Sequence, residues 1–148
     1  MKTLPDLSAI NKDIYERYYL YISKNIVIRV QKVNDAYELE RKANEGELIH
    51  NGETIQITKE EFDELKKLAK QHILRYSYQI QESPRIVLRI YQGDYEGLKR
   101  IEVNFNNIEE SQSFTPLDWF GKEITDTTLA QDGKLLQLTK EEFQKLLL

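Results

Sequence analysis

The chain has 148 residues and contains no cysteine, so it holds neither disulfides nor thiol nucleophiles. Its 40% hydrophobic and 31% charged residues describe one soluble globular domain over residues 1–148. The net charge is −4, and acids and bases are interspersed, which argues against a nucleic-acid partner. Residues 1–13 lack the apolar core of a signal peptide, and no apolar run is long enough to cross a membrane. We therefore expect a cytoplasmic protein without a membrane partner.

The first third of the chain predicts β-structure. Residues 14–20, IYERYYL, are aromatic and β-prone, and residues 24–33 and 36–43 flank the turn residues Asn34 and Asp35 as in a hairpin. Residues 44–53 are expected to form a loop with an edge strand or a second turn.

The next segment, residues 58–71, predicts a helix. Thr58 and Glu61 form a capping box, and Phe62, Leu65, Leu68 and Ala69 make an apolar stripe. Two strands, over residues 73–80 and 85–91, are expected to follow around a turn at Glu82–Pro84.

The last third begins with a turn at Gly97 and a strand in which Ile101, Val103 and Phe105 alternate with Arg100, Glu102 and Asn104. We expect a short helix over residues 108–114, a strand over 135–138 and a helix over 139–148. Residues 51–62 and 132–143 resemble each other as turn, strand, capping box and helix. This echo has two interpretations: recurring local physics, which we favour, or a two-half architecture.

Residues 97–125 carry a family resemblance. They contain a Gly-Leu turn, a strand with Glu102, a helix, and then a segment with Pro116, Trp119, Gly121, Glu123 and Thr125. This order resembles the C-terminal signature of the CYTH, or triphosphate tunnel metalloenzyme, superfamily. The resemblance implies an α+β fold: an antiparallel, tunnel-like β-barrel of about seven or eight strands with flanking helices.

In that family, inward bases hold a triphosphate, so the resemblance also implies a phosphate site. Arg29 matches the first arginine of an R-x-R strand, Lys42 the lysine of T-x-K, and Arg75 the arginine of K-x-R-Y. Arg89 stands where the family has an acid, and Arg100 precedes Glu102 on its strand. The implied phosphate-binding residues are therefore Arg29, Lys42, Arg75, Arg89 and Arg100.

Inward glutamates of the family hold Mg²⁺ or Mn²⁺. Glu102 keeps the first acid of E-x-E, with Asn104 in place of the second, and Glu40 is the other implied metal ligand. Because Mg²⁺ requires near-octahedral oxygen ligation, the loss of acids predicts weak metal binding.

The family motif of the opening strand, E-x-E-x-K, has no match before Ile14. Glu38–Lys42 spells it literally, but we interpret that segment as the family's third element. The sequence thus predicts a missing first strand and a barrel that is open or completed by a partner. An open edge favours a homodimer.

Two functions remain open. The chain either binds a triphosphate-containing or otherwise phosphorylated, nucleotide-like ligand with weak or no catalysis, which the substituted acids favour, or it is an active Mg²⁺- or Mn²⁺-dependent enzyme. The enzyme would be a triphosphatase acting on tripolyphosphate, thiamine triphosphate or nucleotides, or a class IV-type adenylate cyclase.

Overall fold

A computed structural model describes residues 4–44, 50–125, 127–130 and 132–147. Its elements, in chain order, are β1 (Lys12–Ile22), β2 (Ile26–Val33), β3 (Ala36–Asn44), β4 (His50–Gln56), α1 (Lys59–Lys66), β5 (Gln71–Glu82), β6 (Arg85–Gln92), η1 (Gly93–Tyr95), β7 (Lys99–Asn104), α2 (Ile108–Ser113), η2 (Thr128–Ala130), α3 (Asp132–Leu135) and α4 (Lys140–Leu147). No helix in these ranges is both long enough and apolar enough to span a membrane.

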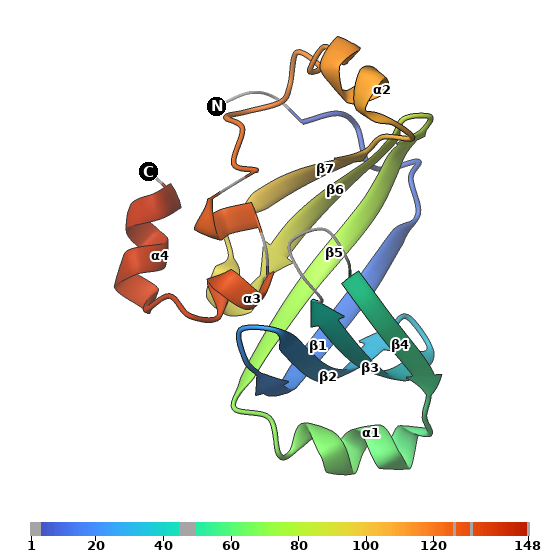
Figure 1. The fold of residues 1–148 in the computed structure, drawn as a ribbon, viewed down its shortest axis with the longest axis vertical. Helices are drawn as coiled ribbons and strands as arrows, with labels where there is room; N and C mark the ends of the chain where they lie inside the picture. The colour runs from blue at the N-terminus through green and yellow to red at the C-terminus, as the bar shows by residue number, and fades with distance from the viewer. Residues whose placement is uncertain (1–3, 45–49, 126, 131, 148) are drawn as a thin grey trace.

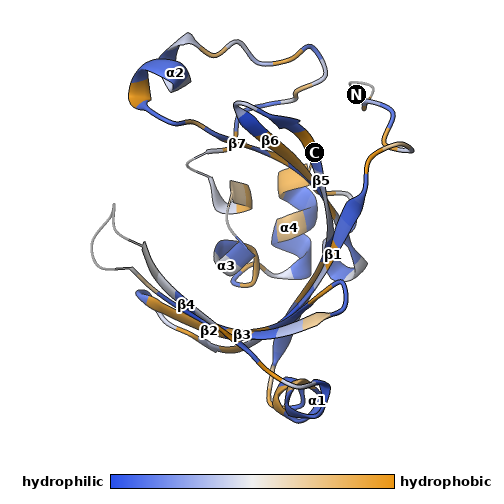
Figure 2. Ribbon diagram, turned by 90° about the vertical axis from the view of Figure 1, so that its right-hand side faces the viewer, coloured by the Kyte–Doolittle hydropathy of each residue, from blue (hydrophilic) through white to orange (hydrophobic). Residues whose placement is uncertain are grey.

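The seven strands form one antiparallel sheet in the order β4-β3-β2-β1-β5-β6-β7 (Figure 1). The sheet is strongly curved but does not close, which confirms the predicted open, tunnel-like α+β fold. Figure 2 shows α3 and α4 on the concave side of the sheet and α1 outside it. The C-terminal helices therefore fill part of the space that the sheet encloses.

The expected gap at the first strand is wrong. Residues 12–22 form β1, which lies at the centre of the sheet and pairs with both β2 and β5. The opening lies instead between the edge strands β4 and β7. The β-prone aromatic run over residues 14–20 therefore lies within the first strand of the sheet.

The two capping boxes formed as predicted, but what surrounds them differs from expectation. Thr58 and Glu61 exchange both hydrogen bonds at the start of α1, and Thr139 and Glu142 do the same before α4. Helix α1 ends at Lys66, so Leu68 lies beyond it and is 69% exposed. Only Phe62 of the expected stripe is buried.

The predicted strand over residues 135–138 is also wrong, because Leu135 ends helix α3 and residues 136–147 contain no strand. The echo between residues 51–62 and 132–143 thus extends to the capped helix but not to the strand, which agrees with recurring local physics.

The core lies between the C-terminal helices and the concave face of the sheet. Leu135, Leu136 and Phe143 pack there with buried sheet residues that include Tyr19, Ile73, Tyr91 and Leu98. Gly97 allows α4 to approach closely, since its φ is +104° and a Cβ there would lie 3.2 Å from Leu147 Cδ1. Apolar burial therefore holds the C-terminal segment against the sheet.

Leu135→Ala should lower the free energy of unfolding by about 2–5 kcal/mol, because Leu135 is completely buried and the truncation leaves a cavity. The matched variant Leu68→Ala, on the surface, should change it by less than about 0.5 kcal/mol. Urea titration followed by circular dichroism measures both. Equal effects would mean that α3 is not packed as described.

Candidate functional site

Charged side chains line the concave face because every second residue of each strand points there. Arg17 of β1, Arg75 of β5 and Arg100 of β7 are all buried there, with exposed fractions of 9%, 3% and 5%. Buried arginines need anions to compensate their charge. The candidate site is therefore described by the carboxylates that pair with these arginines.

The centre of the site is Asp132, the first residue of α3. Its Oδ2 accepts hydrogen bonds from Arg75 Nη1 at 2.6 Å and from Arg17 Nη1 at 3.2 Å. Its Oδ1 lies 3.2 Å from Arg100 Nη1 and accepts a hydrogen bond from the Tyr91 hydroxyl. One carboxylate from the C-terminal segment thus joins bases from three strands.

A second cluster lies on β2 and β3. Arg29 donates to Glu40 Oε2 through Nε and Nη2, at 3.0 and 2.6 Å. The Gln31 amide donates to Glu38 and Glu40, and its oxygen accepts from Arg17 Nε at 3.0 Å. The Arg29 cluster is therefore connected to the Asp132 centre through Gln31 and Arg17.

A third cluster lies on the other side of the centre. Glu102 of β7 accepts from Arg89 at 2.9 Å and from Arg100 at 2.8 Å. Arg89 also donates to the Ser77 hydroxyl at 2.9 Å. Because Arg100 contacts both Glu102 and Asp132, the polar network runs from β3 to β7 without a break.

The aromatic ring of Tyr15 lies close to three of the arginines. The guanidinium carbons of Arg17, Arg75 and Arg89 lie 5.2, 5.1 and 5.9 Å from the centre of its ring, within cation–π range. The ring helps to hold these planar groups on one face of the sheet.

The positive charge of this face is only partly compensated. Burial, together with repulsion from Arg75 and Arg29, lowers the pKa of Arg17 to about 10. Burial would raise the pKa of Asp132, but Arg75, Arg100 and Arg17 outweigh it and hold this pKa at about 2. Among the described residues, Nε of Arg75, Arg89 and Arg100 is buried without a hydrogen-bond partner. The hydrogen-bonding capacity of these three guanidinium groups is therefore not fully used within the face.

The carboxylates of Glu40 and Glu102 lie apart from one another and are paired with arginine. The described residues contain no group of three or more His, Cys, Asp or Glu that could hold an ion. Glu40 and Glu102, the two predicted metal ligands, lie on β3 and β7 with four strands between them in the sheet order. Each is already paired with arginine. Mg²⁺ is usually held by one or two carboxylates together with waters and substrate phosphates, so Glu40 and Glu102 stay predicted metal ligands.

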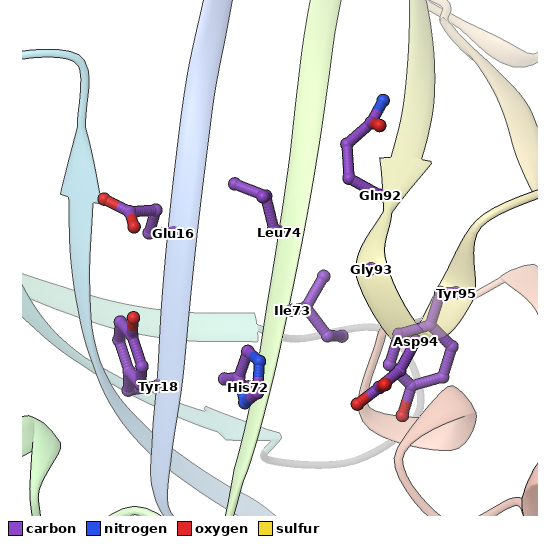
Figure 3. Close-up of a pocket in the computed structure, with 9 residues that line it drawn as sticks. All are labelled: Glu16, Tyr18, His72, Ile73, Leu74, Gln92, Gly93, Asp94 and Tyr95. Atoms are coloured by element: carbon purple, nitrogen blue, oxygen red, sulfur yellow. The ribbon is translucent and has the colours of Figure 1, made fainter.

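A separate cavity of about 170 Å³ lies on the opposite, convex face (Figure 3). It is lined in part by Glu16, His72 and Asp94, with the Tyr18 ring stacked on His72. Two acids and no Arg or Lys line it, so it does not suit an anion. The arginines of the concave face, rather than this cavity, define the candidate site.

The structure brings most of the predicted site residues onto one face, while their roles in binding stay a prediction. Arg29, Arg75, Arg89 and Arg100 lie on the concave face, as do Glu40 and Glu102, whereas Lys42 lies on the same face of β3 but is exposed. Arg17 and Tyr15 were missed, although their alternation with Glu16 and Tyr18 was a visible signal. Asp132 was also missed, because a single aspartate before Gly133 reads as a turn.

Comparison with known proteins agrees with this architecture. No protein-family model matches the chain. The inorganic triphosphatase of Nitrosomonas europaea is 26% identical over 127 residues, which cover 84% of this chain and 83% of that protein. Two crystal structures, one described as the hypothetical protein NE1496 and the other as the inorganic triphosphatase NE1496, superpose with a TM-score of 0.71. Their identities are 24% and 23%, and each match covers 90% of both chains.

The chain has the fold of an inorganic triphosphatase. The open seven-stranded sheet with its few helices is the triphosphatase fold, and the arginine network lies on the concave face of that sheet.

Asp132 should make stability depend on pH. Its pKa falls from an ordinary 3.8 to about 2 on folding, so its contribution is complete above pH 5 and is lost as the pH falls through 3.8 to 2. The loss is about 2 kcal/mol in all, and about half of it is complete by pH 3.

Urea titrations between pH 6 and pH 3 give the free energy of unfolding of wild type and Asp132→Asn at each pH. This free energy should fall more steeply with decreasing pH in the wild type, because Asp132→Asn has no carboxylate to protonate; the difference between the two slopes measures the loss. Asp118→Asn, at an exposed site, is the control and should follow the wild type. Identical slopes for all three proteins would contradict the ion-paired state of Asp132.

Proposed function

We propose that the concave face binds an oligophosphate anion, either inorganic triphosphate or the triphosphate group of a nucleotide-like molecule. The protein would then be a divergent CYTH-like binder with weak or no turnover. The observation that carries the proposal is the gathering of buried arginines from β1, β2, β5 and β7 on one face, beside the half-buried Arg89 of β6, with the Nε donors of Arg75, Arg89 and Arg100 unpaired.

Oligophosphates suit this face chemically. Each phosphate presents several charged oxygens, and the planar guanidinium fork binds such oxygens through paired, charge-assisted hydrogen bonds. The arginines lie along the sheet from Arg29 on β2 to Arg100 on β7 rather than at one point. A linear chain of phosphates can contact such a row, whereas a single phosphate reaches only part of it.

The state of the carboxylates supports weak or absent turnover. Glu102 accepts from Arg89 and Arg100, and these bases outweigh its burial and lower its pKa. Arg29 lowers the pKa of Glu40 in the same way. Carboxylates held as ion-pair partners are poor ligands for a divalent cation, because the arginines repel the ion.

An active, metal-dependent triphosphatase is the second candidate. The relatedness to the N. europaea inorganic triphosphatase over most of both chains favours it. Glu102 is the acid on which this candidate depends, because it is one-third exposed and lies beside Arg89 and Arg100. The edge-to-edge homodimer also stays a prediction, with β4 and β7 as the edges that could pair.

Arg75→Gln should weaken tripolyphosphate binding at least tenfold, because it removes charge-assisted hydrogen bonds at the centre of the site. Arg41→Gln is the matched control, since Arg41 is exposed and alternates with Glu40 onto the other face of β3. Isothermal titration calorimetry without added metal measures both affinities. If wild type binds no tripolyphosphate, or if both variants bind equally, the anion site is wrong.

Phosphate release from tripolyphosphate, thiamine triphosphate and ATP, with Mg²⁺ or Mn²⁺, should stay close to the buffer rate. Glu102→Gln should then change little in this assay while folding normally. Robust metal-dependent turnover that Glu102→Gln abolishes would reject the weak-turnover proposal and establish the triphosphatase.

A further inference from the structure

Asp132 has the surroundings of a bound phosphate. The two oxygens of its carboxylate form hydrogen bonds or ion pairs with Arg17, Arg75, Arg100 and the Tyr91 hydroxyl. These four partners come from β1, β5, β7 and β6. The carboxylate belongs to α3, outside the sheet, while all four partners belong to the sheet. An anion from another segment of the chain therefore occupies the centre of a basic site that the sheet builds.

An external anion cannot use this centre while Asp132 remains there. The terminal nitrogens of Arg17, Arg75 and Arg100 that point to the centre are already engaged, and Asp132 is only 7% exposed. A phosphate placed beside it would meet a like charge in a poorly solvated environment, where repulsion is strong. Phosphate and carboxylate therefore compete for the same donors.

The contacts that hold α3 on the sheet can be replaced without unfolding the sheet. Helix α3 has four residues, and Leu135 and Leu136 anchor its far end in the core. Arg100 also donates to the Leu129 carbonyl and Gln71 to the Leu136 carbonyl, so side chains of the sheet hold the segment on both sides of Asp132. The strand pairing itself involves no residue of this segment.

We propose that Asp132 is an internal competitor for the phosphate site: ligand binding replaces its carboxylate on Arg17, Arg75 and Arg100 and loosens α3 from the concave face. This inference rests on the proposed oligophosphate function and adds its regulation. Anything that stabilises the docked C-terminal segment then weakens ligand binding, and anything that releases the segment strengthens it.

Asp132→Asn tests the proposal, because it removes the charge and keeps the size of the side chain. Tripolyphosphate should bind this variant at least tenfold more tightly than wild type in calorimetry. Asp132→Glu, which keeps the charge, should bind no more tightly than wild type. An unchanged or weaker affinity in Asp132→Asn would overturn the proposal and show that Asp132 only positions the arginines.

Hydrogen exchange on the wild type keeps the test decisive if Asp132→Asn does not fold. The Leu136 amide, which donates to the Asp132 carbonyl within α3, should exchange faster when tripolyphosphate is added. Slower or unchanged exchange at saturating ligand would overturn the proposal. If neither wild type nor Asp132→Asn binds tripolyphosphate, the proposed function itself fails. If both bind it equally tightly, the function stands and only the competition by Asp132 is rejected.

Discussion

The pairing of Asp132 with Arg17, Arg75 and Arg100 is the constraint on which the rest of the concave face depends. Three buried guanidinium groups repel one another, and removing them from water is unfavourable unless an anion compensates them. That anion, Asp132, comes from the C-terminal quarter of the chain, which follows the last strand in the sequence. The Arg29–Glu40 and Arg89–Glu102 pairs extend the compensation outward, and Gln31 and Arg100 connect them to the centre.

Sheet geometry explains why so many charges can share one surface. Alternation sends Tyr15, Arg17 and Tyr19 of β1 to the concave side, and each neighbouring strand contributes its own alternate residues in register. Some partners are set by the strand register, since Arg29 lies opposite Glu40 and Gln31 opposite Glu38. Arg89 instead lies opposite Arg100, and Glu102 accepts hydrogen bonds from both. The apolar packing of Leu135 and Phe143 covers one end of the face and leaves the arginines on the rest.

The sequence predicted those parts that local patterns determine. Period-two alternation located β2, β3, β5, β6 and β7, and capping boxes located the starts of α1 and α4. It also placed Arg29, Arg75 and Glu102 on one face. Two features failed because they depend on distant partners: Leu135 and Leu136 look like a strand until the core that buries them is known, and Asp132 is one acid among many until three strands bring arginines to it.

Strand β1 joins the two parts of the sheet. Strands β1–β4 form one meander and β5–β7 another, and the described strands of the two meet only in the β1–β5 ladder. Arg17 belongs to the first meander, whereas Arg75 and Arg100 belong to the second. Asp132 therefore bridges the two meanders, because one carboxylate contacts bases from both.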